Sequence, residues 1–182
     1  MPCSRPTFVS NQKTSFSRAF SMVELAIVLL ILAVLAGIAI PRYGRAIASY
    51  RTTAAAQRIV SDLALAQATA RGTSSSVSIL FIPASAGGPG EGRGGGYTID
   101  GIRDLDRASN TYTVKLASEP YLASIAGVDS TNAASVSKAD STVKLTFDGY
   151  GTGDGNVTVI IQSGAAQKTV TFDSATGRCT IQ

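Results

Sequence analysis

The chain has 182 residues, of which 16 are basic and 12 are acidic, so its formal net charge is +4. It contains no histidine, which excludes a Ser-His-Asp triad, a histidine-paired cysteine nucleophile and a histidine-ligated metal. We therefore expect a protein that is not an enzyme, and we assign it no cofactor and no metal-ligating residue. The sequence leaves open a carboxylate pair among Asp100, Asp104 and Asp106, although a solvated loop is the favoured interpretation. The length leaves room for one domain beside a membrane segment.

The first 19 residues are polar and contain three basic residues, Arg5, Lys13 and Arg18, and no acidic residue. Serine and threonine are frequent between them, and no apolar periodicity of a helix or strand is visible. We expect this segment to act as a leader that does not need to fold.

A nearly unbroken apolar segment follows, from Phe20 to Ile40, and it ends at Pro41. As an α-helix, its 21 residues would span about 30 Å, which matches the hydrocarbon core of a bilayer. Glu24 is its one ionisable residue. A carboxylate inside such a segment is costly unless it has a partner, so Glu24 is a candidate functional residue.

The residues around Glu24, from Arg18 to Glu24 (RAFSMVE), resemble the N-terminal signature of type IV prepilins and type II secretion pseudopilins. In that family a membrane peptidase cuts before an apolar residue, usually Phe, and methylates the new terminus. The glutamate is then the fifth residue, and the apolar helix runs on to a proline. The resemblance implies processing between Ala19 and Phe20, and an assembly role for Glu24 and Pro41. The family normally has Gly where this chain has Ala19.

The resemblance also implies a domain organisation and a location. Residues 1–19 would be a cytoplasmic leader removed by the prepilin peptidase, and residues 20–72 the pilin helix, with 20–40 in the inner membrane. Residues 73–182 would form a β-rich head in the periplasm. Basic residues flank both ends of the span, so charge placement alone does not set the orientation. Removal of the leader would leave 13 basic and 12 acidic residues, a net charge of about +1.

Two other interpretations of the apolar segment explain it less well. A secretory signal peptide has an apolar stretch of about 7 to 15 residues, which is shorter than this one, and an acid at its start would hinder it. An ordinary single-span anchor explains the length of the segment and leaves Glu24 unexplained.

After Pro41 the helical pattern resumes as a single apolar stripe. Its members fall three, four or five residues apart: Ile47, Tyr50, Ala54, Ile59, Leu63, Ala66 and Ala70. We expect this helix to pack its stripe on a sheet, to reach about Arg71 and to stop at Gly72. Because proline removes a backbone donor, we also expect a kink or local melting near Gly37.

From Ser74 onward the sequence changes to short β-type runs separated by turn residues. The predicted strands are Val77–Ile82, Tyr97–Asp100, Tyr112–Leu116, Val143–Phe147, Val157–Ile161, Thr169–Phe172 and Cys179–Ile181. The fold class is therefore α+β, with a long N-terminal transmembrane and stalk helix packed on an antiparallel β-sheet head, as in pilins. Cys179 would be the only cysteine left after processing, which excludes an internal disulfide, and we expect it to be buried.

The last strands resemble the C-terminal half of the GspH/FimT subgroup of minor pseudopilins. The resemblance lies in Val143–Gly149, Asn156–Gln162, Lys168–Asp173 and Gly177–Ile181. Heads of that subgroup end in successive hairpins with a phrase such as Phe-Asp-x-x-Gly and a closing Gly-Arg. This resemblance implies a minor pseudopilin or minor pilin that assembles with other pilins or pseudopilins in a periplasmic filament.

Two glycine-rich stretches suggest ligand sites only weakly. Gly90, Gly92 and Gly95 form a G-x-G-x-x-G pattern, but a strand-like run follows where a dinucleotide site needs a helix. The stretch from Asp148 to Asn156 offers oxygen ligands but lacks the six to eight that calcium takes. Both stretches are interpreted as loops.

DNA binding is the alternative function. FimT-type minor pilins that capture DNA carry a C-terminal Gly-Arg-x-Arg phrase, and this chain has Gly177-Arg178-Cys179-Thr180, with only the first arginine. Arg178 is thus the candidate DNA contact, although a net charge near +1 provides few phosphate contacts. The sequence leaves open whether the machine is a type II secretion system, a type IV pilus or a competence pseudopilus.

Overall fold

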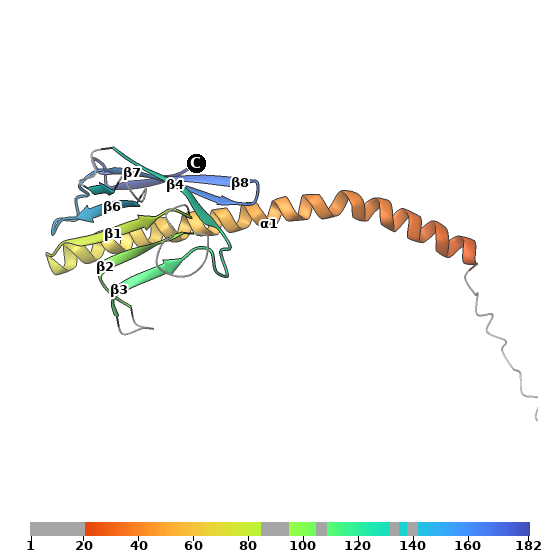
Figure 1. Ribbon diagram of the computed structural model, residues 1–182, viewed down its shortest axis with the longest axis horizontal. Helices are drawn as coiled ribbons and strands as arrows, with labels where there is room; N and C mark the ends of the chain where they lie inside the picture. Colours follow the sequence, from red (N-terminus) through yellow and green to blue (C-terminus); the bar gives the residue numbers. More distant parts are fainter. Residues whose placement is uncertain (1–20, 85–94, 105–108, 132–134, 138–141) are drawn as a thin grey trace, which may run out of the picture. The chain divides into compact units, whose positions relative to one another are not determined.

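The computed structural model describes residues 21–84, 95–104, 109–131, 135–137 and 142–182. Contacts within the chain divide it into two compact units, Met1–Ile40 and Pro41–Gln182. Among its described residues, the second unit contains the rest of the helix and the nine strands β1 to β9 (Figure 1).

One helix, α1, runs without a break from Met22 to Thr73. The local melting expected near Gly37 is therefore absent, and a kink near Gly37 stays a prediction. The expected stop at Gly72 was wrong, because Gly72 is still helical. The helix ends one residue later, at Thr73. Ser74 then adopts a positive φ of 51°, and the amide of Ser75 donates to the carbonyl of Ala70 at 3.3 Å.

The strands form two antiparallel sheets. The first has the order β3-β2-β1-β6-β5, and its strands are β1 Val77–Ile82, β2 Gly96–Asp104, β3 Ser109–Lys115, β5 Ser135–Ser137 and β6 Thr142–Phe147. The second has the order β4-β7-β8-β9, and its strands are β4 Ser124–Thr131, β7 Asn156–Ser163, β8 Ala166–Asp173 and β9 Arg178–Ile181. All seven predicted strands are confirmed, whereas β4 and β5 were missed.

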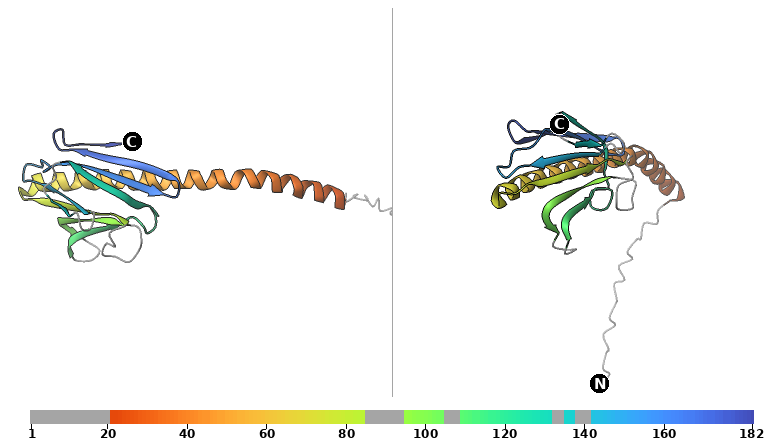
Figure 2. Two further views of the ribbon diagram at one scale, coloured as in Figure 1. Left: turned by 45° about the horizontal axis from the view of Figure 1, so that its top comes forward. Right: turned by 60° about the vertical axis from the view of Figure 1, so that its left-hand side comes forward.

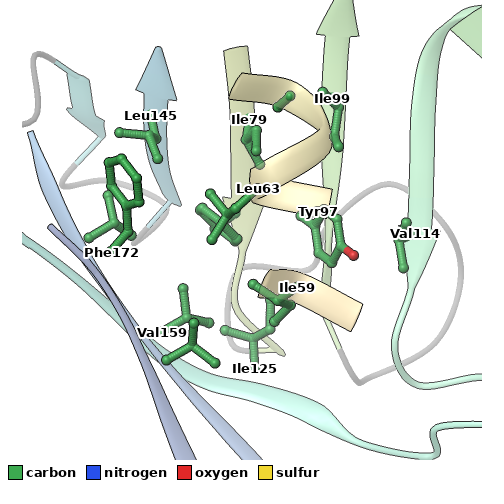
Figure 3. Close-up of a cluster of buried hydrophobic side chains, with 14 of the residues drawn as sticks. Ile59, Leu63, Ile79, Tyr97, Ile99, Val114, Ile125, Leu145, Val159 and Phe172 are labelled. Atoms are coloured by element: carbon green, nitrogen blue, oxygen red, sulfur yellow. The ribbon is translucent and has the colours of Figure 1, made fainter. Parts of the chain in front are cut away.

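The core of the second unit lies between the helix and the two sheets. Alternate residues of β6 and β7 are buried, as expected for strands with one face on a core. Figure 3 shows Leu63 of the helix pointing among side chains of both sheets, with Ile79 and Leu145 from the first and Val159 and Phe172 from the second. The two further views in Figure 2 show the yellow, C-terminal part of α1 alongside both sheets.

The buried stripe of the helix differs from the predicted one in its first turns. Tyr50 is 78% exposed and Ala54 is exposed, so these two assignments were wrong. The helix instead buries the apolar residues Ala55, Ala56, Ile59, Leu63, Ala66 and Ala70. Residues three and four positions before Ile59, which are Ala56 and Ala55, lie on the same face of the helix as Ile59. Ala54, five positions before Ile59, lies outside that face.

Leu63 should therefore matter far more to stability than its neighbour Leu65. In a fragment of residues 47–182, which we expect to fold without the apolar segment, Leu63→Ala should lower the free energy of unfolding by about 2–5 kcal/mol. Leu65 is 46% exposed on the same helix, so Leu65→Ala is the matched control and should cost less than about 1 kcal/mol. Urea denaturation followed by circular dichroism measures both, and equal losses would contradict the packing described.

Candidate functional site

The apolar stretch Met22–Ile40 exposes its side chains all round the helix. Leu25, Leu30 and Val34 are 55%, 66% and 59% exposed, although they lie on different sides of α1. Within the described residues, α1 is the one helix long and apolar enough to cross a membrane. A helix that is apolar on every side is stable only inside a membrane or among other helices.

Glu24 lies in the first turn of this helix and is exposed. The amide of Leu25 donates to the carbonyl of Ser21 at 3.1 Å, which closes that turn. A carboxylate is favoured there by the helix dipole, whose positive end is at the N-terminus. Ala19 and Phe20 lie outside the described residues. Pro41 is part of α1, 17 residues after Glu24 in the sequence, and it begins the second unit.

Arg178 begins β9, at the edge of the second sheet, and is exposed. Its cross-strand partner is Asp173 on β8. The carboxylate of Asp173 accepts hydrogen bonds from the amide of Ala175 and the hydroxyl of Thr176, at 3.0 and 2.9 Å. An acid directly opposite the arginine weakens the positive potential that a DNA phosphate would meet.

A buried carboxylate, Asp62, was missed by sequence reasoning. It is 4% exposed, on the core face of α1. The hydroxyl of Tyr97, on β2, donates to its Oδ2 at 2.5 Å, and Nε of Arg58 donates to the same oxygen at 3.1 Å. Nη2 of Arg58 in turn donates to the hydroxyl of Tyr112 on β3. We call Arg58, Asp62, Tyr97 and Tyr112 the buried-acid cluster.

Electrostatics fix the protonation states of two members of the cluster, Tyr97 and Arg58, at neutral pH. Burial, together with the carboxylate and the hydrogen bond of Asp62, raises the pKa of Tyr97 far above its ordinary value. Burial alone would lower the pKa of Arg58, but Asp62 and the tyrosines outweigh it and raise that pKa. Tyr97 therefore remains a hydrogen-bond donor, and Arg58 remains a cation.

The loop considered for calcium has a structural role instead. Oδ1 of Asp148 accepts hydrogen bonds from the backbone amides of Tyr150 and Thr152, at 3.0 and 2.7 Å. This oxygen is therefore already occupied by bonds within the turn. Two backbone carbonyls of the loop face the helix. The carbonyl of Gly151 accepts a hydrogen bond from Nε2 of Gln67 at 2.9 Å, and the carbonyl of Tyr150 accepts a hydrogen bond from Nε of Arg71. In the part of the chain that the structure describes, no cluster of three metal-ligating side chains occurs.

Gly151 is required where this loop meets the helix. Its φ is +76°, and a Cβ at this position would lie 2.3 Å from Nε of Arg71. The other glycine-rich stretch, with its G-x-G-x-x-G pattern, falls almost entirely outside the described residues.

Cys179 on β9 is half-buried and packs against the core, and it is a free thiol. Burial raises the pKa of its thiol, which keeps it protonated and unreactive. The expected burial of Cys179 is thus only partial.

A long apolar N-terminal helix followed by antiparallel sheets that its second half covers defines a pilin-like α+β protein. The comparison with family models is more specific, because the model of type II transport protein GspH matches residues 55–176. The chain belongs to the GspH family, which consists of structural pseudopilins of type II secretion. Searches of curated proteins and of solved structures gave no significant match.

The raised pKa of Tyr97 predicts a specific alkaline loss of stability. The unfolded chain would release this proton near pH 10 and the folded chain only at higher pH, so the stabilisation is complete below pH 10 and declines above it. At pH 9, Tyr97→Phe should cost about 1.5–3 kcal/mol, the contribution of a hydrogen bond to a charged group. That cost should be about 1.4 kcal/mol smaller at pH 11.

Urea denaturation of the 47–182 fragment at both pH values gives the two differences. All other titrating groups are the same in the variant and in the wild type. Their contributions therefore cancel when the two proteins are compared at each pH. A difference that stays constant from pH 9 to pH 11 would contradict the proposed hydrogen bond to Asp62.

Proposed function

We propose that the protein is a minor pseudopilin, processed between Ala19 and Phe20 and assembled into a short periplasmic filament of a type II secretion system. The observation that supports this most is the stretch Met22–Ile40, whose apolar side chains are exposed all round the helix. Such a stretch fits a bilayer before assembly and a bundle of like helices afterwards. The family match over the head agrees with this role.

Cleavage would give Glu24 its electrostatic partner. The new amine on Phe20 would be positive and one helical turn from Glu24 in the same subunit. In a filament, a helix shifted along the axis would bring its amine beside the Glu24 carboxylate of its neighbour. An unpaired carboxylate in the bilayer costs about 3 kcal/mol on insertion scales, and pairing recovers part of that cost. The pair would therefore favour assembly and set the register between subunits.

The remaining assignments follow from this role. Residues 1–19 would be the cytoplasmic leader that the prepilin peptidase removes, and residues 20–40 would span the inner membrane. Residues 73–182 would form the periplasmic head, and the partners would be other pseudopilins. Pro41 would mark the end of the membrane segment. The same arrangement would also suit a minor pilin of a type IV pilus.

Capture of DNA by the head is the alternative function, with Arg178 as its contact. It gains little support from the head surface, because Asp173 is paired with Arg178 across the strands and the processed chain carries only about one net positive charge. A salt-sensitive gel shift that is lost in Arg178→Ala would favour this alternative.

Glu24→Ala should separate processing from assembly. Because the carboxylate is not needed for hydrophobic insertion, the variant should still enter the membrane and be cleaved, giving an intact mass that begins at methylated Phe20. Its incorporation into filaments, measured by co-purification with the other subunits, should fall at least about tenfold, since 1.4 kcal/mol already corresponds to that factor.

Val23→Ala changes an adjacent apolar residue without removing a charge, and it should assemble like the wild type. Undiminished incorporation of Glu24→Ala would mean that the carboxylate serves another step, such as recognition by the peptidase. If the Glu24→Ala variant is not cleaved, the carboxylate is needed for recognition by the peptidase.

A further inference from the structure

An open pocket of about 280 Å³ lies on the head, between α1, β3 and the turn that follows β3. The polar residues that line it are Arg58, Tyr112, Thr113, Lys115, Ser118 and Tyr121. They come from segments more than 50 residues apart in the chain, so the fold assembles this pocket. Nothing in the assembly role of the N-terminal helix uses it.

The lining of the pocket is positively charged. Arg58 and Lys115 are its two ionised residues, and no carboxylate lies among the residues that form its wall. Asp62 contacts Arg58 from the core side, where its Oδ2 already accepts the hydrogen bonds of Tyr97 and Arg58. Glu119 belongs to the turn after β3 and is exposed, but it is not part of the wall.

The guanidinium of Arg58 is held in place before any ligand arrives. Nε is fixed by Asp62 at 3.1 Å and Nη2 by the hydroxyl of Tyr112, whose ring also lies 6.0 Å below the guanidinium carbon. Among the described residues, Nη1 has no hydrogen-bond partner. The side chain is still 38% exposed, so a fixed donor remains available to a group in the pocket.

We propose that this pocket binds a carboxylate presented by a partner protein. A planar guanidinium with a free N–H edge matches a carboxylate, Lys115 adds a second positive charge, and the hydroxyls of Tyr121 and Ser118 add neutral donors. The volume lies just below the usual range for small-molecule sites, which leaves room for one acidic group rather than a nucleotide. DNA is bound by several cations along its backbone, and this pocket has two.

The carboxylate could come from an acidic side chain or from the C-terminus of a chain, and short peptides distinguish the two. Acetyl-Ala-Glu-Ala-amide carries only the side-chain carboxylate, acetyl-Ala-Ala-Ala carries only the terminal one, and acetyl-Ala-Gln-Ala-amide carries neither. Each is titrated into the full-length chain in detergent micelles, with the side-chain ¹⁵Nε resonance of Arg58 as the readout. We expect saturable binding of at least one carboxylate peptide and at least tenfold weaker binding of the glutamine peptide.

Variants of the wall locate the site. Lys115→Gln, at an exposed position of β3, should fold and bind the carboxylate peptide on the order of tenfold more weakly. Arg58→Lys keeps the charge but loses the planar fork, and it should weaken binding at least as much. Lys144→Gln, on β6 of the same sheet, and Arg178→Ala, on the other sheet, are the matched controls and should bind like the wild type. For the variants, binding is followed by the backbone amide resonances of β3.

Several results would overturn the proposal. They are the absence of saturable binding by both carboxylate peptides, equal binding of the glutamine peptide, or unchanged affinity in Lys115→Gln. Preferential binding of a short oligonucleotide at Arg58 would replace it with a nucleic-acid site. The titration needs no filament, so its failure would leave the proposed assembly function intact, and a failure of Glu24→Ala to impair assembly would leave the pocket intact.

Discussion

The apolar side chains of α1 have to leave water, and the helix meets this requirement in two ways along its length. As far as Ile40 they are exposed on every side, so only a membrane or other helices can cover them. From Ala55 onward the helix has one buried apolar face, which the two sheets of the same unit cover. A single continuous helix thus combines a segment that needs an external partner with one that stabilises the head by itself.

The buried-acid cluster fixes the position of the second segment of the helix on the first sheet. Burying Asp62 would be costly, but a hydrogen bond from Tyr97 and an ion pair with Arg58 offset that cost. Unlike apolar packing, these contacts can form only when the helix lies at one particular position on the first sheet. Because Arg58 also reaches Tyr112 at the surface, the interaction that fixes the helix orients the guanidinium in the pocket wall.

Hydrophobic periodicity was enough to predict the helix, seven strands and an α+β class, because these elements bury a regular face. The pilin-like assignment came from the resemblance of residues 18–24 to the prepilin signature. It missed β4, where Ile125 is the one residue of the strand that is fully buried and where pairing with β7 supplies the stability. Glu24 stood out as an acid in an apolar run. Asp62 did not, since its partner Tyr97 lies 35 residues away and periodicity does not reveal which strand faces a helix. An acid at a stripe position, four residues after an arginine, was the available signal.

On assembly of the proposed filament, the surroundings of Met22–Ile40 should change from lipid to other pseudopilins. A photoreactive amino acid at Leu29, which is 56% exposed, tests this most directly. The account predicts lipid adducts in cells that lack the other pseudopilins and pseudopilin adducts when the filament assembles, whereas the same probe at Leu65 on the head should form no lipid adducts. Absence of lipid adducts at Leu29, or lipid adducts that persist unchanged in assembled filaments, would contradict the account.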